Sequence, residues 1–253
     1  MERWVGKVAV VTGASAGIGA AIVEALVRHG MIVVGLARRE EIIQDMAKKL
    51  SGEKGKLYAL KADVSDEAQV ANAFQWVKEN LKTLHVLVNN AGVLGDIPMT
   101  EPIDSMVFRR IFDVNVIGLS LCTSEGLRLM REKGVDDGHI IHINSISGHS
   151  IHPTPGTGGI PYIASKHCVT VLTEGLRREL VERGSKIRVT SISPGVVKTE
   201  IFAVSNDRRA STIFQNNPSL DPKDIADALI YALGAPPNVQ IHDIIIKPVG
   251  EKI

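Results

Sequence analysis

The stretch VVTGASAGIGAA, residues 10–21, joins a β-branched run to a helical pattern through a glycine-rich turn. Gly13, Gly17 and Gly19 stand in this turn with the spacing GxxxGxG. Glycines between a strand and a helix let a pyrophosphate approach the backbone, and the N-terminus of the helix points at it. The same glycines also suit an ordinary tight turn, but the succession of strand, turn and helix favours dinucleotide binding.

Strand-like and helical segments continue to alternate along the chain. Strand-like runs cover 7–13, 31–37, 56–64, 85–92, 138–148 and 186–195, and helical patterns cover 21–30, 40–50, 66–81, 105–133 and 162–183. Buried strands separated by helices of this length indicate right-handed βαβ units on a parallel sheet. The sequence therefore predicts an α/β fold, a doubly wound parallel sheet of the Rossmann type with helices on both faces.

The whole chain, 1–253, is expected to form one such domain, because it contains no internal repeat, linker or low-complexity segment. Irregular stretches near 148–161 and 198–220 both follow strand ends. Ligands of doubly wound sheets bind at the carboxyl ends of the strands. Both stretches are therefore expected to border a substrate pocket.

The composition argues against several classes of function. The net charge is +1, with 29 basic against 28 acidic side chains, so nothing favours nucleic acid or an anionic membrane as partner. The two cysteines lack CxxC spacing, and no apolar run approaches the roughly 18 residues of a membrane span. The N-terminus has no signal-peptide pattern. We expect a cytoplasmic protein with reduced thiols.

The end of the second predicted strand bears on the choice of dinucleotide. An acidic residue there would bind the adenosine ribose of NAD and repel the 2′-phosphate of NADP. The sequence GLARREE has Ala37 at this point, followed by Arg38 and Arg39. Guanidinium groups offer paired donors to a phosphate dianion, so the pattern favours NADP(H). The alternative is that both arginines lie on a solvated turn and pair with Glu40 and Glu41.

The segment IPYIASKHC, residues 160–168, places Tyr162 and Lys166 one helical turn apart. In a helix of about 100° per residue, Lys166, Val169 and Leu180 fall within roughly 40° of Tyr162. Tyr162 and Lys166 therefore lie on the apolar face that is expected to point at the core. A lysine there is costly unless its charge is used, although its ammonium can also reach along its stem to the surface.

A phenol beside an ammonium suits the interconversion of a carbonyl and an alcohol. The Lys166 ammonium and a positively charged oxidised nicotinamide would lower the pKa of Tyr162 from its ordinary value of about 10. In the reduction direction, the same hydroxyl gives its proton to the nascent alkoxide. Ser145, at the end of the run HINSIS, either holds the carbonyl oxygen from a second side or is simply a turn residue.

Six motifs occur together in a characteristic order: TGASAGIG, NNAG at 89–92, FDVNVIG around Asn115, Ser145, YIASK, and SPG at 193–195. In this combination they resemble the short-chain dehydrogenase/reductases, and the resemblance covers nearly the whole chain. It implies that Tyr162 is the acid/base and that Ser145 orients the substrate oxygen. It also implies that Lys166 lowers the tyrosine pKa and binds the nicotinamide ribose, and that Asn115 anchors a water that relays protons to Lys166.

The resemblance further implies a set of residues that bind NADP(H), and it implies no metal. This set comprises Gly13, Ser15, Gly17, Ile18 and Gly19 in the phosphate turn, Asp63 and Val64 beside the adenine, Asn90, Ala91 and Gly92 in the next turn, Pro194, Val197 and Thr199 beside the nicotinamide amide and pyrophosphate, and Tyr162 and Lys166 at the nicotinamide ribose.

Within the family, MERW, DDGHIIHINSISGH, LTEGLRREL and ISPGVVKTE are similar to a subgroup of insect farnesol dehydrogenases and vertebrate cytosolic keto-steroid and carbonyl reductases. This similarity implies an apolar alcohol or its carbonyl as substrate, with a farnesol-type isoprenoid alcohol favoured over a keto-steroid. The expected lid carries the apolar residues Ile201, Phe202, Val204, Ile213 and Phe214. They agree with an apolar substrate, but they equally suit a cover over the cofactor or an interface.

Two other functions stay open as alternatives. A non-catalytic NADPH sensor has no use for Ser145, Tyr162 and Lys166, whose presence argues against it. An NAD-using hydroxyacyl or sugar dehydrogenase is disfavoured by the missing acid after the second strand. The family resemblance also implies a homodimer or homotetramer that assembles through the helices near 105–133 and 162–183.

Overall fold

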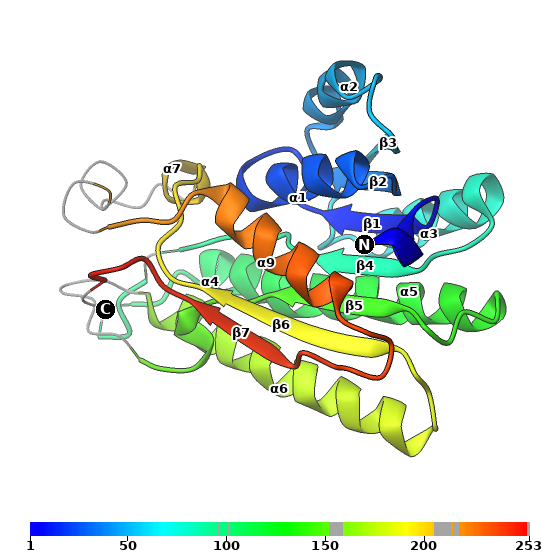
Figure 1. Cartoon of the computed structure of the whole chain (residues 1–253). Coiled ribbons are helices and arrows are strands. Elements are labelled where there is room, and N and C mark those ends of the chain that lie inside the picture. Colours follow the sequence, from blue (N-terminus) through cyan, green and yellow to red (C-terminus); the bar gives the residue numbers. More distant parts are fainter. Residues whose placement is uncertain (96, 101, 152–158, 205–213, 215–217, 252–253) are drawn as a thin grey trace.

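The alternating segments build one seven-stranded, all-parallel sheet in the order β3-β2-β1-β4-β5-β6-β7 (Figure 1). The computed structural model describes residues 1–95, 97–100, 102–151, 159–204, 214 and 218–251. The strands are β1 (Val8–Thr12), β2 (Ile32–Ala37), β3 (Lys56–Lys61), β4 (Val86–Asn89), β5 (His139–Ile143), β6 (Arg188–Pro194) and β7 (Asp243–Ile246). The strand order reverses direction between β1 and β4, which is where such sheets bind dinucleotides.

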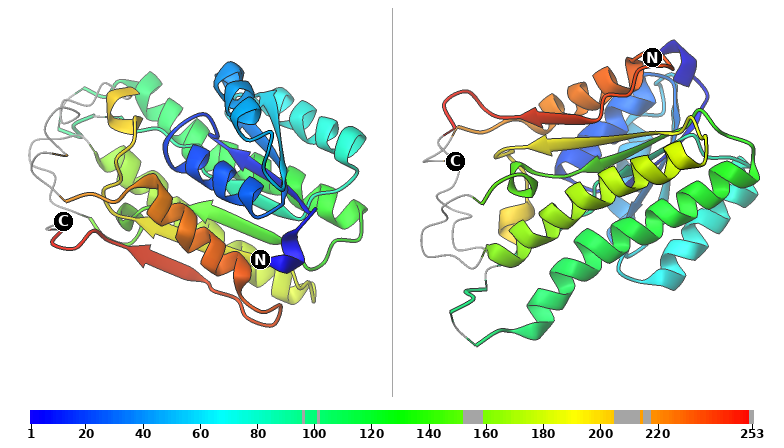
Figure 2. Two further views of the ribbon diagram at one scale, coloured as in Figure 1. Left: turned by 45° about the horizontal axis from the view of Figure 1, so that its top comes forward. Right: turned by 90° about the horizontal axis from the view of Figure 1, so that it is seen from below.

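Helices cover both faces of the sheet (Figure 2). On one face lie α1 (Gly17–Arg28), α2 (Glu40–Lys49) and α9 (Pro222–Gly234), and on the other lie α3 (Glu67–Leu81), α5 (Leu119–Glu132) and α6 (Ile160–Glu182). The remaining helical segments are α4 (Ser105–Phe112), α7 (Ile201–Val204), the 3-10 turns η1 (Glu2–Trp4) and η3 (Ile146–Gly148), and the π-helical turn η2 (Asp113–Gly118). The predicted doubly wound α/β fold is therefore confirmed.

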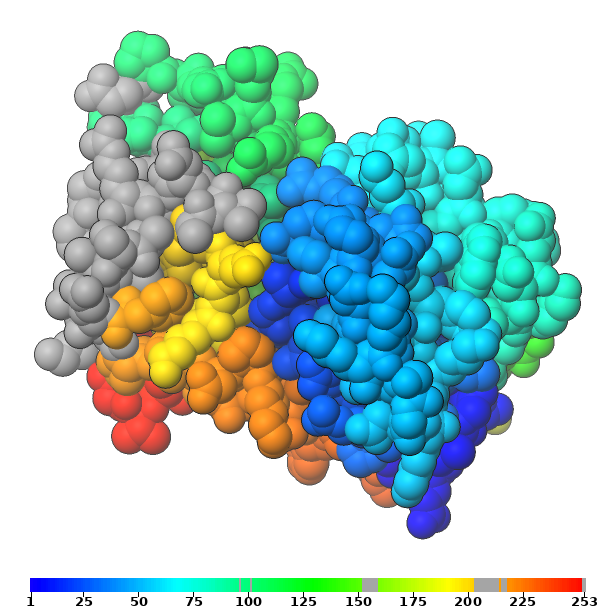
Figure 3. Space-filling view, turned by 90° about the horizontal axis from the view of Figure 1, so that it is seen from above, coloured from blue at the N-terminus to red at the C-terminus, as the bar shows by residue number. Residues whose placement is uncertain are grey.

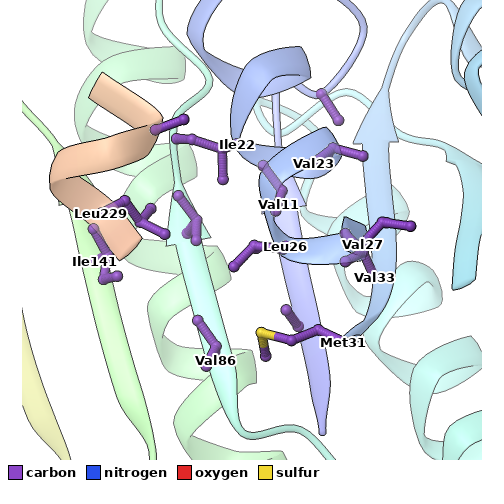
Figure 4. Packing of buried hydrophobic residues seen from close by; sticks show 14 of the residues in the cluster. Val11, Ile22, Val23, Leu26, Val27, Met31, Val33, Val86, Ile141 and Leu229 are labelled. Carbon is purple, nitrogen blue, oxygen red and sulfur yellow. The ribbon is translucent and has the colours of Figure 1, made fainter. Parts of the chain in front are cut away.

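The buried strands are apolar on both faces because each face is covered by helices. In β1, Ala9 and Val11 belong to the cluster under α1 and α9, whereas Val8 and Val10 belong to the cluster under α3 and α5. Figure 4 shows the first cluster, in which Leu26 of α1 lies among strand side chains. Full burial of an aliphatic side chain contributes about 2 kcal/mol, so these two clusters hold the sheet and its helices together.

The apolar stripe expected on the helix with Tyr162 faces the interior. Val169 and Leu180 of α6 are buried, and Lys166 is only 6% exposed. On the outer side, Glu174 forms ion pairs with Arg177 and Arg178. The ammonium of Lys166 therefore stays inside the molecule and does not reach the surface.

Four segments differ from the expected pattern. The helix predicted over 105–133 is interrupted by the π-helical turn η2, and the strand predicted over 138–148 ends at Ile143. The chain turns after Ile143 because the Ser145 hydroxyl accepts the backbone N–H of Ser147 and caps η3. The pattern also predicts neither α9 nor β7, a four-residue strand at the sheet edge whose alternate residues are exposed.

A cluster of hydrogen bonds joins the carboxyl ends of β1 and β4. The Thr12 hydroxyl oxygen accepts the backbone N–H groups of Asn90 and Ala91, each at 3.0 Å. In return, the Asn90 side-chain amide donates to the carbonyls of Thr12 at 2.9 Å and Gly13 at 3.2 Å. These bonds hold the glycine turn after β1 against the turn after β4.

Replacement of Thr12 by valine tests the strength of this connection. Valine has nearly the same volume but leaves the two buried N–H groups unpaired, so we expect the free energy of unfolding to fall by about 3 kcal/mol. Thr12→Ser is the matched control, because it keeps the hydroxyl and loses only a methyl group, at a cost of about 1 kcal/mol. Denaturant unfolding of both variants measures the difference, and equal losses would contradict the role given to the hydroxyl.

Candidate active site

A cavity of about 630 Å³ opens at the carboxyl ends of the strands. It runs from Arg38, Arg39 and Asp63 after β2 and β3, past the glycine turn, to Ser145 and Tyr162 at β5 and α6. Every residue that the sequence predicts for the site lines this cavity except Gly19 and Asn115. A volume of this size is typical of small-molecule and cofactor sites.

The glycine turn has the shape and the donors for a phosphate. Gly13 and Gly17 have φ of 65° and 53°, a region that favours glycine. A Cβ on Gly13 would lie 2.8 Å from the Asn90 amide nitrogen, and one on Gly19 would collide with the Gly13 carbonyl. No side chain caps the N-terminus of α1, so its first N–H groups are available to an anion. Gly19 thus sets the packing under the turn, while the rest of the turn lines the cavity.

Arg38 and Arg39 line the cavity beyond the end of β2 and pair with residues distant in sequence. Arg38 lies 3.9 Å from the Asp63 carboxylate, and Arg39 lies 3.2 Å from the Glu200 carboxylate. The alternative in which they pair with Glu40 and Glu41 is not what the structure shows. Figure 3 shows the segment around residue 200, in yellow, beside surface atoms of the N-terminal part of the chain, in blue. The side chain of Asp63 is fixed by Ser65, whose hydroxyl donates to it at 2.7 Å.

Ser145, Tyr162 and Lys166 meet at the other end of the cavity. Ser145 is 8% exposed, and its hydroxyl is hydrogen-bonded to that of Tyr162. The Lys166 ammonium donates to the Ile143 carbonyl at 2.9 Å and lies 5.8 Å from the centre of the Tyr162 ring. A strand end and one turn of α6 therefore bring together a hydroxyl, a phenol and an ammonium.

Burial changes the acidity of both titratable groups. It raises the pKa of Tyr162 to about 12, while the hydrogen bond to Ser145 acts in the opposite direction. It lowers the pKa of Lys166 from 10.5 to about 8. The sequence predicts that Lys166 lowers the tyrosine pKa. In this arrangement the Lys166 ammonium is directed at the Ile143 carbonyl. Desolvation is the larger effect on the pKa of Tyr162, so that pKa is raised.

Asn115 lies behind this cluster, in the π-helical turn, and is 2% exposed. Its side chain accepts the Val93 N–H at 2.9 Å and donates to the Val93 carbonyl at 3.0 Å. It also donates to the Ser165 hydroxyl at 3.0 Å, and that hydroxyl donates to the Tyr162 carbonyl at 2.7 Å. Asn115 thereby connects the turn after β4 to the helix that carries Tyr162.

Parts of the two predicted substrate loops fall outside the described residues. In the stretch 148–161 these are residues 152–158, and in 198–220 they are 205–213 and 215–217, which include Ile213. Of the apolar lid residues, Ile201 and Phe202 line the cavity. Phe202 packs edge-on against Phe214, with ring centres 5.8 Å apart.

With this geometry established, comparison with known proteins identifies the family. A family model described as short chain dehydrogenase matches residues 7–210. The chain belongs to the short-chain dehydrogenase/reductase family. The resemblance inferred from the sequence motifs is therefore confirmed, and the protein is an oxidoreductase of the kind that acts on alcohols and carbonyls.

Individual relatives cover the chain from end to end. The farnesol dehydrogenase of Aedes aegypti is 47% identical over 253 residues, 100% of both chains. Dehydrogenase/reductase SDR family member 11 of Gallus gallus is 44% identical over 253 residues, 98% of each. Among solved structures, the closed form of serine dehydrogenase complexed with NADP⁺ has a TM-score of 0.86 and 30% identity over 97% of this chain and 96% of that chain.

The part of the chain that the structure describes contains no helix long and apolar enough to span a membrane. The same residues include no group of three or more His, Cys, Asp or Glu side chains arranged to hold a metal ion.

Sequence reasoning missed several residues of this short-chain dehydrogenase/reductase site. Thr12 is the first residue of the TG pair, and its position before a glycine at a strand end is the only local signal for it. Glu200 reaches Arg39 across 161 positions, so no sequence spacing reveals that pair. Val93 and Leu94, which line the cavity, follow directly after the motif NNAG and could have been included by extending it.

The depressed pKa of Lys166 predicts a pH dependence of stability. Between pH 8 and 10.5 the unfolded lysine binds a proton that the folded lysine does not, so the free energy of unfolding rises with pH across this window. At neutral pH, burial of the Lys166 ammonium lowers the free energy of unfolding by about 3 kcal/mol. We therefore expect Lys166→Met to raise the free energy of unfolding at pH 7 by about 2 kcal/mol, after loss of the hydrogen bond to Ile143.

Denaturant unfolding at pH 7 and pH 10 measures this effect. The wild type should gain about 2 kcal/mol relative to Lys166→Met between the two values. Lys49→Met, at an exposed position of α2, is the control and should follow the wild type. A constant difference between wild type and Lys166→Met at both pH values would contradict the depressed pKa.

Proposed function

We propose that this short-chain dehydrogenase/reductase is an NADP(H)-dependent alcohol dehydrogenase and carbonyl reductase for apolar substrates, with a farnesol-type isoprenoid alcohol favoured. The observation that carries the proposal is the cluster of Ser145, Tyr162 and Lys166 in the wall of the cavity. A phenol hydrogen-bonded to a serine and backed by an ammonium is a proton donor and acceptor for a carbonyl or alcohol oxygen.

Each polar residue has a distinct part in this chemistry. The nicotinamide supplies or accepts the hydride when it is bound. Ser145 holds the substrate oxygen, and Tyr162 gives it a proton in reduction or takes one in oxidation. Lys166 places a positive charge behind Tyr162, which favours the phenolate, and it is the donor for the ribose hydroxyls. Asn115 fixes the Val93 turn and the start of α6, so that Tyr162 keeps its position.

The preference for NADP(H) rests on the charges at the opposite end of the cavity. Ala37 stands where an acid would bind the ribose of NAD, and the next two residues are Arg38 and Arg39. Their ion pairs, at 3.9 Å with the partly exposed Asp63 and at 3.2 Å with the exposed Glu200, are ones that a phosphate dianion can replace. The serine dehydrogenase with the same fold is complexed with NADP⁺, which agrees with this preference.

The choice of an apolar substrate rests on the side chains around Tyr162 and Ser145. The cavity wall there includes Ile146 and Ile163, and Phe202 lines the same cavity. The name of the Aedes aegypti relative, farnesol dehydrogenase, supports an isoprenoid alcohol. A keto-steroid or a general carbonyl substrate fits the same walls, and a non-catalytic NADPH sensor leaves the buried proton-transfer cluster without a purpose.

Self-association as a homodimer or homotetramer is part of the proposal. Met106 of α4, Ile117 of η2 and Val171 of α6 are 77%, 51% and 71% exposed. These residues belong to the two predicted assembly segments, and Figure 2 shows α5 and α6 side by side on the same face. A second copy that covered this face would bury all three side chains.

Turnover with a panel of substrates tests the function. Purified protein is mixed with NADP⁺ or NADPH and with farnesol, farnesal, keto-steroids or small diketones, and the absorbance of the reduced nicotinamide is followed. Light scattering of the same protein gives its molar mass and so tests self-association. Tyr162→Phe should lower kcat by about a thousandfold, because proton transfer is lost. Tyr231→Phe, exposed on α9, is the matched control.

Two outcomes would contradict the proposal. No turnover of any substrate in the panel, with NADPH binding retained, would favour a sensor. Full activity of Tyr162→Phe would exclude Tyr162 as the proton donor.

The cofactor preference is tested by the ratio of kcat/KM for NADPH to that for NADH. Arg38→Ala and Arg39→Ala should each lower this ratio about tenfold, since each removes charge-assisted hydrogen bonds to the 2′-phosphate. Glu200→Gln is the companion variant, because it frees the Arg39 guanidinium without removing it, and it should raise the ratio. If Arg38→Ala and Arg39→Ala leave the ratio unchanged, the arginines do not select the cofactor.

A further inference from the structure

A buried carboxylate lies under the backbone that follows β6. The Glu251 side chain is 1% exposed, and its Oε1 accepts the Val196 N–H at 2.9 Å. Gly195 makes room for it, because a Cβ there would lie 2.8 Å from the Glu251 carboxyl carbon. Figure 1 shows the segment after β7, in red, returning to the carboxyl end of β6. A residue near the end of the chain therefore contacts a wall of the cavity.

The contact fixes one edge of the segment 195–198. On this edge the Gly195 N–H donates to Ile246, and Val196 both donates to Glu251 and accepts the Leu220 N–H at 2.8 Å. The Lys198 N–H donates to the Leu220 carbonyl at 2.9 Å, which completes a parallel bridge between Val197 and Leu220.

The backbone N–H and C=O of Val197 point to the opposite edge of this segment. In a parallel bridge of this kind, the N–H and C=O of the central residue point away from the paired strand. Within the described residues, neither the N–H nor the C=O of Val197 has a hydrogen-bond partner, although Val197 is only 6% exposed. Val197 lines the cavity. A buried, unpaired donor and acceptor side by side point to a ligand that supplies both.

The position of Val197 places this pair near the reacting groups. β6 is the direct neighbour of β5, and the Asn144 N–H, next to Ser145, donates to the Ile192 carbonyl at 2.7 Å. The free N–H and C=O therefore lie at the same end of the cavity as Ser145 and Tyr162. A primary carboxamide, such as that of nicotinamide, has one acceptor and one donor group that match them.

We propose that Glu251 is a positioning residue for the nicotinamide ring: its carboxylate holds Val196 so that Val197 presents an N–H and a C=O to the carboxamide. The inference rests on the proposed function, since it assumes a nicotinamide cofactor. The Val196 N–H donates to the buried Glu251 carboxylate, and the Lys247 ammonium lies 3.6 Å from the Oε2 of that carboxylate. A hydrogen bond to a charged acceptor is stronger than one to a neutral group. Loss of Glu251 loosens the register of the segment but removes no group of the phosphate turn and neither arginine.

The test compares two ligands that differ only in the nicotinamide part. NADPH contains it, and 2′-phospho-ADP-ribose lacks it but keeps the groups that the glycine turn and the arginines bind. In Glu251→Ala the Kd for NADPH should rise about tenfold, while that for 2′-phospho-ADP-ribose stays within about twofold of the wild type. Glu251→Gln keeps an acceptor oxygen and should recover most of the lost affinity.

Gly195→Ala is a second, independent variant. It keeps the carboxylate but displaces it from the Val196 N–H, so it should give the same selective loss as Glu251→Ala. Equal weakening of both ligands in both variants would show a general structural role and overturn the inference. Unchanged NADPH binding in Glu251→Ala would also overturn it. Failure of the wild type itself to bind NADPH would instead contradict the proposed function.

Discussion

The burial of the Lys166 ammonium is the constraint on which the site depends. A charge at 6% exposure is costly unless polar groups compensate it, and here the Ile143 carbonyl accepts it at 2.9 Å. Ile143 is the last residue of β5, and Ser145 turns the chain immediately after it. The strand end, the serine and the first turns of α6 are therefore one unit. The cost in stability at neutral pH is the consequence of keeping a positive charge beside Tyr162, which the proposed proton transfer at the phenol would require.

The turn after β4 connects this unit to the phosphate turn. Asn90 bonds the carbonyls of Thr12 and Gly13 on one side, and three residues later Val93 is held by Asn115 on the other. Asn115 then reaches α6 through Ser165. A continuous series of hydrogen bonds thus runs from the glycine turn to Tyr162. Each bond is modest by itself, but together they set the distance between the glycine turn and Tyr162.

Local patterns predicted most of the fold and of the catalytic cluster, because β1, α1 and α6 are each specified by the periodicity of their own residues. Tyr162 and Lys166 fall on one face at a fixed spacing, and Lys166 is buried as that spacing predicts. What the sequence could not show depends on pairs far apart in the chain. Arg39 meets Glu200, and Glu251 meets Val196, through the assembled sheet. The π-helical turn at Asn115 also escaped prediction, since one extra residue in a turn leaves the helical pattern on both sides intact.

The two ends of the cavity separate two kinds of specificity. At one end, after β2 and β3, lie the exposed Arg38 and Arg39 and the partly exposed Asp63, with ion pairs that solvent can reach. At the other end, the cavity wall includes the apolar Ile146 and Ile163 beside Ser145, Tyr162 and Lys166. Between these ends lie the glycine turn, the segment after β6, which Glu251 holds, and Glu200, which pairs with Arg39. Under the proposed function, a change of cofactor preference and a change of substrate should therefore be separable by mutations at the two ends. The segment 194–200 lines the cavity between them and leads directly into Ile201 and Phe202.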